Sequence, residues 1–435
     1  MQTLEDALGF TVAVRLIDFA NSSQADRIWH RCLLPSVLAA MPNIRCIAMN
    51  EQVTNSLMGQ YHFGIEHEVA FWNLQTHQFA DFTNTAFDQL DRLIAQLPEY
   101  ASDYPQLRIG DMNIKRKRWY IEGYERFSET GALLDCTPKG IEIRTTIQPT
   151  IAGTIQELRE RFARLCDVAA PAHWLPVLTS FTPIQTDFLP QPPLNRYESA
   201  RREASPEKRT AHIPMLTYGP DLNFSMTGLS PEALIRVGQK LTYYSPAIVP
   251  FSFSSPFYGG QLWSGLSVRT HLRTGQRPAA MVFLERPEDL IASTPSLTKI
   301  ARLPAEVGRI EFKACDSCGD FALYGSLLAL MKGLVLDQTL PGLALVPDAA
   351  AHQRSALVGF HDAALRDQAI LLLSAAEQAL TDDSERSLLQ PLWQMVQQGT
   401  TPAQVLRDRW QPGADLAQIL SAGYAPEPLV QSVIC

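Results

Sequence analysis

The 435-residue sequence lacks an apolar run long enough to cross a membrane. A transmembrane helix needs about 18 consecutive apolar residues, and Lys332 interrupts the best candidate, residues 327–336. The N-terminus also lacks a basic stretch followed by an apolar one, because Glu5 and Asp6 come first. These absences argue against a membrane protein and against a secreted one.

The sequence is poor in cysteine and has no excess of positive charge. Its 7 cysteines are an odd number spread over a long chain, which is typical of a reduced, cytoplasmic protein and not of a disulfide framework. Lys and Arg number 37 against 45 Asp and Glu, a net charge of -8. Such a chain is not attracted over long range to nucleic acid or to anionic membranes. We therefore expect no nucleic-acid or membrane partner; the sequence predicts no oligomeric state.

Two familiar phosphate-binding loops are also missing, namely G-x-x-x-x-G-K-[ST] and a G-x-G-x-x-G between a strand and a helix. If ATP binds, metal ions and cationic side chains must therefore hold its phosphates. The candidate cations are Lys115, Lys117 and Arg118 in one strand-like run, together with Arg269 and Arg273. A solvated surface role is the alternative for each of them.

Hydrophobic residues make up 46% of the chain, which favours a packed core. Short runs rich in β-branched and aromatic residues mix with helical periods without a regular βαβ rhythm. Several runs alternate polar and apolar residues, which indicates a mainly antiparallel sheet with helices on one face, an α+β fold. The predicted strands are 62–73, 116–127, 140–148, 174–181, 218–226 and 309–315, and the predicted helices are 85–97, 154–169, 231–244, 321–336, 364–380, 385–398, 402–409 and 415–422.

The sequence predicts three segments. Residues 1–60 are an N-terminal extension, or they result from an upstream start codon chosen in error, with Met58 as the alternative initiator. Residues 61–345 hold the strands, and residues 346–435 form a helical region that packs on them. Within the second segment, the Pro-rich and charged stretch 183–208 is either a mobile lid or a plain surface loop.

Carboxylates recur on one face of four predicted strands. Because side chains two apart on a strand share a face, Glu66 and Glu68 point together and His67 points into the core. The same alternation groups Glu142, Arg144 and Thr146, then Asp221, Asn223 and Ser225, and finally Arg309, Glu311 and Lys313. Such a face is either a solvated sheet surface or a concave site for metal ions and an anionic substrate. Hard carboxylate oxygens favour Mg²⁺ over zinc.

The same segments resemble the motifs of the ATP-dependent carboxylate-amine ligases, the group that contains the bacterial and plant-type glutamate–cysteine ligases. The run Gly-Ile-Glu-His-Glu at 64–68 resembles the opening G-x-E-x-E strand of that family. Three later blocks, at 218–225, 250–257 and 307–316, resemble its other motifs in the same order. The match covers residues 62–340.

The resemblance implies a catalytic domain over residues 61–345 with a fold similar to glutamine synthetase, in which an antiparallel sheet curves around the nucleotide and metals. It implies that phosphate passes from ATP to the side-chain carboxylate of glutamate, and that the amine of cysteine then displaces it. ATP, glutamate and cysteine are the implied small-molecule partners, with Mg²⁺ as cofactor. The alternatives are a different amine, or an inactive homologue that binds nucleotide.

The resemblance also assigns roles to residues by position. The implied metal ligands are Glu66, Glu68, Glu142, Asp221 and Glu311. The implied catalytic and substrate-binding arginines are Arg144 and Arg269, the further substrate contacts are Ser254, Ser255 and Asn223, and the nucleotide-binding cations are Lys115, Arg118 and Lys313.

Two departures from the family pattern bear on the substrate. Many relatives have His-x-His where this chain has Asp221-Leu-Asn223, and the familiar arginine after the last glutamate is Lys313. Asp and Asn still offer oxygen to Mg²⁺, whereas Lys lacks the two-pronged donor of Arg. The acceptor amine is therefore less well specified than the use of ATP.

Cys315 and Cys318 have the C-x-x-C spacing of redox and metal sites. Zinc is disfavoured because no second pair or His cluster accompanies them. Structural thiols and a redox switch acting on the strand of Glu311 are the two interpretations.

Overall fold

The computed structural model describes residues 59–106 and 117–424 of the chain. Nine strands form one sheet in the order β10-β9-β11-β6-β1-β4-β3, and β2 and β5 also pair with β1. All of these pairs are antiparallel except β10 with β9. The strands are β1 Tyr61–Asn73, β2 Gln78–Ala80, β3 Trp119–Phe127, β4 Leu133–Arg144, β5 Trp174–Val177, β6 Pro220–Met226, β9 Ala280–Leu284, β10 Thr298–Ile300 and β11 Ile310–Phe312, with β7 Phe257–Tyr258 and β8 Gln261–Leu262 as a separate hairpin.

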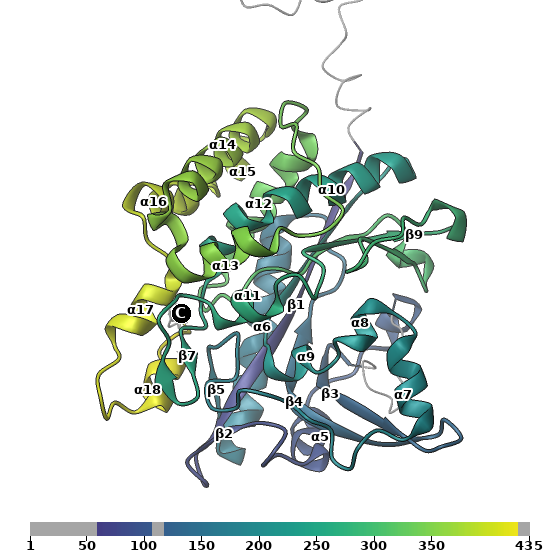
Figure 1. Ribbon diagram of the computed structural model, residues 1–435, viewed down its shortest axis with the longest axis vertical. Coiled ribbons are helices and arrows are strands. Elements are labelled where there is room, and N and C mark those ends of the chain that lie inside the picture. Colours follow the sequence, from purple (N-terminus) through teal and green to yellow (C-terminus); the bar gives the residue numbers. More distant parts are fainter. Residues whose placement is uncertain (1–58, 107–116, 425–435) are drawn as a thin grey trace, which may run out of the picture. The chain divides into compact units, whose positions relative to one another are not determined.

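Helices occupy much of the rest of the described chain (Figure 1). The α-helices are α5 Phe87–Ala95, α6 Ile151–Ala169, α7 Arg196–Glu203, α8 Pro206–Arg209, α9 Ile213–Leu216, α10 Pro231–Ile248, α11 Val268–Arg273, α12 Ala322–Leu336, α13 Ala349–Val358, α14 Ala363–Ala379, α15 Asp383–Ser387, α16 Gln390–Gln398, α17 Pro402–Asp408 and α18 Leu416–Ser421. Short 3-10 helices are η1 Ala101–Gln106, η2 Ala170–Ala172, η3 Val249–Ser252, η4 Pro287–Asp289, η5 Pro304–Glu306 and η6 Gly359–His361. None of the helices within these ranges is long and apolar enough to span a membrane.

Strand β1 separates the core from the charged face of the sheet. Along most of it, buried and partly exposed residues alternate, because successive side chains point to opposite faces. The buried set includes Phe63, Ile65 and Val69, which belong to the main hydrophobic core. Helices α6, α10 and α12 contact strands of this sheet, so a helical layer covers its apolar face. The charged face is left open for a site.

The C-terminal helices pack on this layer through α12. That helix is apolar almost all round and nearly wholly buried, as expected of a helix enclosed between neighbours. It lies against α14 at Gly333, where an added Cβ would come within 2.5 Å of the Cβ of Ala376. Lys332, which interrupts the apolar run, reaches out to pair with Glu385.

The predicted fold class is confirmed: the protein is α+β, with a curved, mainly antiparallel sheet, helices on one face and a helical C-terminal region. Two details differ. The helix predicted over 385–398 is broken into α15 and α16, because Pro391 has no N–H to continue the first of them and sits in the first turn of the second. The strand β9 was missed because it is buried on both faces and shows no alternation.

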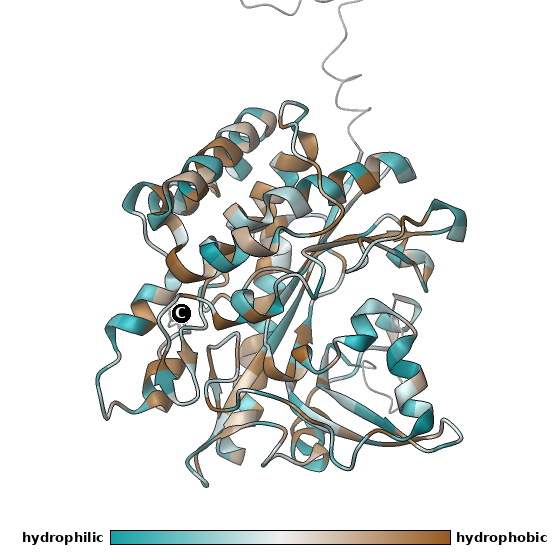
Figure 2. Ribbon diagram, in the orientation of Figure 1, coloured by the Kyte–Doolittle hydropathy of each residue, from teal (hydrophilic) through white to brown (hydrophobic). Residues whose placement is uncertain are grey.

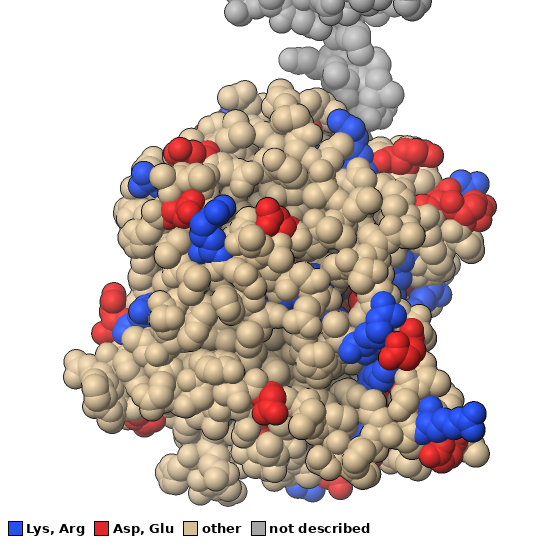
Figure 3. Space-filling model, in the orientation of Figure 1, with Lys and Arg blue, Asp and Glu red and all other residues tan. Residues whose placement is uncertain are grey.

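The charged stretch 183–208 contains α7 and most of α8, which are hydrophilic over most of their length (Figure 2). Helix α7 begins at a capping box between Asn195 and Glu198. The Glu198 carboxylate also pairs with Arg126 of β3 at 2.8 Å, which fixes the helix beside the sheet. A group of Lys and Arg side chains lies at this edge of the molecule with acidic side chains next to it (Figure 3). The domain boundaries predicted near residues 60 and 345 stay predictions.

Candidate active site

The charged face of the sheet borders a cavity of about 960 Å³. Its lining includes the five predicted metal ligands, Glu66, Glu68, Glu142, Asp221 and Glu311. It also includes five of the other predicted site residues, Arg118, Arg144, Asn223, Arg269 and Lys313. Most of the residues that the sequence predicted for the site therefore converge on this cavity; their roles remain proposals.

Strand register brings the carboxylates together. Glu66 on β1 lies opposite Asp221 on one side and Arg144 on the other, and Glu68 lies opposite Glu142. Paired residues on neighbouring strands have Cβ atoms about 5 Å apart, so acidic side chains on the same face meet. The outcome is two separate carboxylate clusters.

The first cluster consists of Glu66, Asp221 and Glu311, whose carboxylate oxygens lie within 4.8 Å of one another. The Lys313 ammonium donates hydrogen bonds to both Asp221 and Glu311. The Arg309 guanidinium lies 3.7 Å from Glu66 and 3.5 Å from Glu311. Two cations from β11 and its flanks thus balance most of the negative charge of three carboxylates.

The two carboxylates that share Lys313 differ in their ionisation. Burial raises the pKa of Asp221 well above its ordinary value, and Lys313 offsets this only in part. Burial opposes the ionisation of Glu311 as well, but Lys313 and Arg309 together outweigh it and hold the pKa of Glu311 below its usual range. Arg309 gives Glu311 a second ion-pair partner, whereas the negative charges of Glu311 and Glu66 oppose the ionisation of Asp221. We conclude that Glu311 is the more firmly ionised of the two.

The second cluster consists of Glu68, Glu122 and Glu142. Lys139 donates to Glu68 at 2.7 Å, and the backbone N–H of Gly219 donates to its other oxygen at 2.8 Å. The Tyr120 hydroxyl donates to Glu142. Each of these contacts orients a carboxylate toward the same space.

Glu122 was missed by the sequence reasoning. It lies on β3 two residues after Tyr120, in a run that the sequence analysis interpreted only through its lysines and arginine, as candidate phosphate-binding cations. Strand β3 pairs with β4 in a register that shifts just after Glu122, where Gly123 passes close to Thr137. The period-two spacing from Tyr120 is the signal that could have placed Glu122 on the charged face.

Both clusters fit a hard divalent cation. Their donors are all carboxylate oxygens, which suit Mg²⁺. Among the described residues, the buried side-chain oxygen of Asn223 has no hydrogen-bond partner, and Asn223 lies opposite Glu311 in the sheet. An orphaned buried acceptor next to an acidic cluster is what a metal ion or its bound water would satisfy. Lys313 lies inside the first cluster, so a cation bound there would compete with its ammonium group.

The predicted nucleotide-binding cations lie in different environments. Lys115 falls outside the described residues. Lys117 donates to backbone carbonyls at the end of α5, at 2.7 Å for that of Leu97. Arg118 lines the cavity but forms ion pairs with Asp103 at 2.6 Å and Glu157 at 2.8 Å. The structure therefore gives Lys117 and Arg118 protein partners.

Arg144 is held at the border of the cavity by its neighbours. Its guanidinium donates to the carbonyl of Lys117 at 2.7 Å and lies 5.3 Å from the centre of the Tyr120 ring. Burial lowers its pKa, although nearby acidic groups act in the opposite direction. A buried guanidinium fixed on an aromatic ring is well oriented to meet an anionic group.

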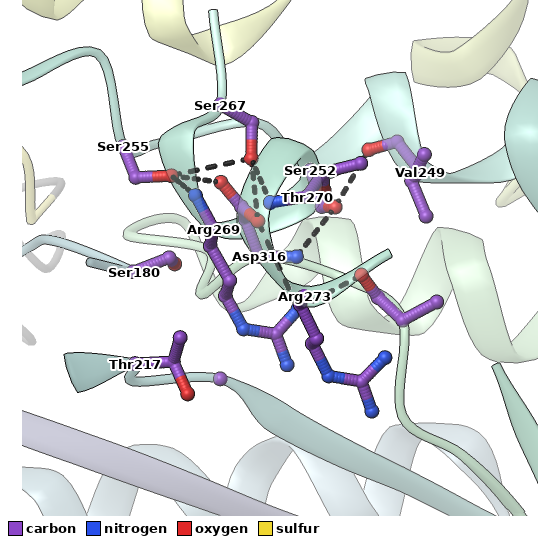
Figure 4. Close-up of polar contacts among 12 residues, drawn as sticks. Ser180, Thr217, Val249, Ser252, Ser255, Ser267, Arg269, Thr270, Arg273 and Asp316 are labelled. Carbon is purple, nitrogen blue, oxygen red and sulfur yellow. Dashed lines mark hydrogen bonds and ion pairs between the residues drawn. The ribbon is translucent and has the colours of Figure 1, made fainter. Parts of the chain in front are cut away.

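Ser254 and Ser255 do not lie on the cavity lining. Both are buried, and their hydroxyls donate inward, to the carbonyl of Ser317 at 2.7 Å and to Asp316 at 2.8 Å. Their turn-like sequence indicated polar contacts but not the direction of those contacts. The structure instead connects Ser255 through Asp316 to Arg269 (Figure 4).

His67 lies on the core face, as predicted. It is fully buried and hydrogen-bonded to the hydroxyls of Tyr324 at 2.9 Å and Tyr424 at 3.2 Å. Burial lowers its pKa to about 3, so this histidine is neutral at physiological pH. It supports the strand that carries Glu66 and Glu68 without entering the cavity.

Cys315 and Cys318 are buried and are not joined by a disulfide. Burial raises the pKa of Cys315 to about 12. Because the thiolate is the reactive form, such a thiol reacts slowly with oxidants and metals. This environment favours structural thiols over the redox switch.

No family model matches the sequence, and no curated protein matches it. Among solved structures, the chain is similar to a bifunctional glutathione synthetase from Pasteurella multocida, with a TM-score of 0.51 and 13% sequence identity. The similarity is one of fold. It covers 86% of this chain and 53% of that one, so the chain spans about half the length of the glutathione synthetase.

Two further structures match with lower scores. The ligase PafA, in its complex with the prokaryotic ubiquitin-like protein Pup, has a TM-score of 0.46 at 11% identity, covering 83% of this chain and 72% of that one. A glutamine synthase homologue has a TM-score of 0.31 at 12% identity, covering 79% of this chain and 69% of that one.

Proposed function

We propose that this protein is an ATP-dependent carboxylate-amine ligase that joins glutamate to cysteine. The observation that carries the proposal is the pair of carboxylate clusters on one face of a curved sheet, in a fold shared with a glutathione synthetase. The sequence motifs that resemble this ligase family supply the three strands of the first cluster and Glu68 of the second, whereas Glu122 and Glu142 lie outside those motifs. The proposal includes a catalytic domain over residues 61–345 and a cytoplasmic location, the latter resting on the cysteine content of the sequence.

The reaction needs activation of a carboxylate, because its oxygen is a poor leaving group. A side-chain oxygen of glutamate forms a bond to the γ-phosphorus of ATP, and the bond from that phosphorus to the departing ADP oxygen breaks. The amine nitrogen of the acceptor then forms a bond to the acyl carbon, and phosphate leaves with the electron pair of the broken C–O bond. The amine gives up a proton in this second step.

In this proposal each of the two carboxylate clusters binds a metal ion. Glu66, Asp221 and Glu311 would hold one Mg²⁺ ion, and the second cluster would hold another. Bound Mg²⁺ neutralises charge that develops on the transferring phosphoryl group. Lys313 and Arg144 add fixed positive charge at the border of the same cavity.

Two other functions are candidates, namely a ligase that uses a different amine and a homologue that binds nucleotide without catalysis. Cysteine as acceptor rests on the family resemblance, and Lys313 in place of an arginine leaves room for a different amine. The internal pairing of Lys313 with Asp221 and Glu311 favours a second candidate, a homologue that binds nucleotide without catalysing ligation.

The test is release of ADP from ATP in the presence of Mg²⁺ and glutamate, with cysteine compared against a panel of other amines and each product identified by mass spectrometry. We expect a γ-glutamylcysteine product that depends on cysteine. Turnover with another amine alone would keep the ligase assignment and change the acceptor. Absence of turnover with every amine, in protein that still binds ADP, would favour the non-catalytic homologue.

A further inference from the structure

Three arginines line one wall of the cavity. Arg269 and Arg273 lie one turn apart on α11, and Arg277 follows just after the helix. Only 4% of the surface of Arg269 and 8% of that of Arg273 is exposed. Their guanidinium groups lie side by side and point away from the helix in the same direction (Figure 4).

The terminal nitrogens of Arg269 are engaged with the protein, whereas its buried Nε has no hydrogen-bond partner among the described residues. Its two terminal nitrogens donate to the carbonyls of Lys313 at 2.9 Å and Ala314 at 2.8 Å, and Asp316 lies 3.8 Å away. Its guanidinium lies flat on Gly219, where an added Cβ would come within 2.3 Å of a terminal nitrogen. Arg269 therefore positions the backbone that carries Lys313, because its two terminal nitrogens are already bound to carbonyls there.

Arg273 and Arg277 have weaker partners. Arg273 donates to the carbonyl of Pro278 at 2.8 Å, and Arg277 donates to the carbonyl of Glu207 at 2.7 Å and to the hydroxyl of Thr210 at 3.3 Å. Within the described ranges, neither arginine has a carboxylate within ion-pair distance. Two guanidinium charges on this wall thus lack a counter-charge in direct contact.

Burial and the neighbouring arginines together make this arrangement costly. Burial lowers the pKa of Arg273 well below its ordinary value, and the charges of Arg269 and Arg277 lower it further. Asp221 and Glu68 across the cavity act in the opposite direction but only from a distance. Like charges in a site of low dielectric repel strongly, so an anion bound between them would relieve the repulsion.

We propose that Arg273 and Arg277 form an oxyanion-binding subsite of the cavity, which takes a carboxylate or a phosphate group. A guanidinium presents a planar fork of donors that matches both groups. The identity of the ligand rests on the proposed function, under which the oxyanion is either a second carboxylate of the acyl donor or a phosphate of the nucleotide. Arg269 is a positioning residue beside this subsite.

The experiment compares thermal unfolding of the full chain with and without anions for the wild type, Arg273→Gln, Arg273→Lys and Arg277→Gln. The probes are inorganic phosphate, ADP, glutarate with two carboxylates and butyrate with one. Arg286→Gln is the matched control, because the Arg286 side chain is 58% exposed and pairs with Glu288 and Asp289, which do not line the cavity.

We expect phosphate or glutarate to raise the unfolding temperature of the wild type and of Arg286→Gln. Arg273→Gln and Arg277→Gln should bind the same probe about tenfold more weakly or worse, the loss expected when a charge-assisted contact is removed. Without ligand, Arg273→Gln should unfold at the wild-type temperature or above it, because a repelling charge is gone. Arg273→Lys should keep part of the response.

Each outcome decides the proposal. Loss of the response to ADP identifies a phosphate, and loss of the response to glutarate identifies a carboxylate; both support the subsite. A wild type that responds to no probe, or glutamine variants that respond as the wild type does, would overturn it. If Arg273→Gln does not fold, the responses of Arg277→Gln test the proposal by themselves. Arg277 lies at the end of the wall and is only partly buried, so its replacement should leave the fold intact. Turnover is not measured, so failure of the ligase assignment would leave this result unchanged.

Discussion

The two faces of the central sheet handle ionisable groups in opposite ways. On the cavity face, Glu66, Glu68 and Glu311 lie against cationic side chains, and Lys313 and Arg309 hold the pKa of Glu311 below its usual range. On the core face and in the helical layer, His67 and His352 are buried and have lowered pKa values, so they are neutral. Alternation along one strand is enough to separate the two environments by a single residue.

The contrast shows where a ligand can act. A neutral histidine bonded to tyrosine hydroxyls offers nothing for a substrate to replace. Carboxylates balanced by lysine and arginine side chains can exchange those cations for a metal ion, and buried arginines without direct counter-charge can accept an anion. Substitutions on the cavity face should therefore change binding and turnover, whereas those on the core side should change stability.

The largest effect is expected at Glu311. Replacing Glu311 with Gln keeps the shape of the side chain but removes the carboxylate that both Lys313 and Arg309 contact. We expect turnover to fall about a hundredfold or more, since the proposed function makes Glu311 a metal ligand and metal-site changes even outside the ligands typically cost 10–100-fold. Rates of ADP release under saturating Mg²⁺ and ATP measure it.

Glu122→Gln makes the matched change in the second cluster and should reduce turnover by a similar factor. Glu288→Gln is the control, because that side chain is 65% exposed and lies away from the cavity lining. Wild-type turnover in both Glu311→Gln and Glu122→Gln would show that neither cluster holds a catalytic metal.

Lys313 distinguishes the two clusters from each other. Its ammonium lies between Asp221 and Glu311, so a divalent cation must compete with it there. We expect Lys313→Met to bind Mn²⁺ about tenfold more tightly, because no internal cation has to be displaced. The variant should also be less stable without metal, because Asp221 and Glu311 lose the lysine that they share.

Electron paramagnetic resonance of Mn²⁺ gives the affinity of this variant, and thermal unfolding gives its stability. Lys299→Met is a suitable control, since Lys299 also lines the cavity but lies over the Phe283 ring. Weaker Mn²⁺ binding in Lys313→Met would mean that the lysine supports the metal site instead of competing with it.

Gly219 connects the cavity face to the arginine wall. The Cβ of an alanine at this position would lie 2.3 Å from a terminal nitrogen of Arg269, so the guanidinium would have to move away. We expect Gly219→Ala to lose about 1–3 kcal/mol of unfolding free energy, the usual cost of overpacking, measured by urea denaturation. Gly325→Ala on α12 is the control, since its Cβ would be 3.4 Å from Ile155 in ordinary contact and should cost nothing. Equal stability of the two variants would contradict the close contact between the Arg269 guanidinium and Gly219.

The sequence predicted the charged face well because that inference needs only local geometry. Period-two alternation places Glu66, Glu68, Glu142, Asp221 and Glu311 on one face whatever the strand order, and all five line the cavity. The motifs also include the strands that carry four of them, all except Glu142 on β4. The helix break at Pro391 was equally local and was available from the chemistry of proline.

What the sequence did not give depends on tertiary packing. Ser254 and Ser255 point inward to Asp316 and Ser317, and no property of the turn itself sets that direction. Lys139 reaches Glu68 from 71 residues away, through the register of β4 against β1. Such contacts follow from how distant segments pack, which alternation and spacing do not encode.

The smallest effect is expected at His352, which belongs to the neutral set. Burial lowers its pKa to about 4, below the unfolded value of 6.5. The unfolded chain therefore takes up a proton first as the pH falls, so the stability due to neutral His352 is fully present above pH 6.5 and is lost as the pH drops toward 4. The loss amounts to about 1 kcal/mol for each pH unit in that window. Denaturant unfolding at pH 7 and pH 5.5 should show a smaller pH dependence in His352→Gln than in the wild type, while His361→Gln, at an exposed site on η6, should match the wild type. His67 contributes a loss of stability of the same sign in all three proteins, so the difference between the variants is due to His352. If the wild type and His352→Gln lost stability equally with falling pH, His352 would be charged in the folded protein.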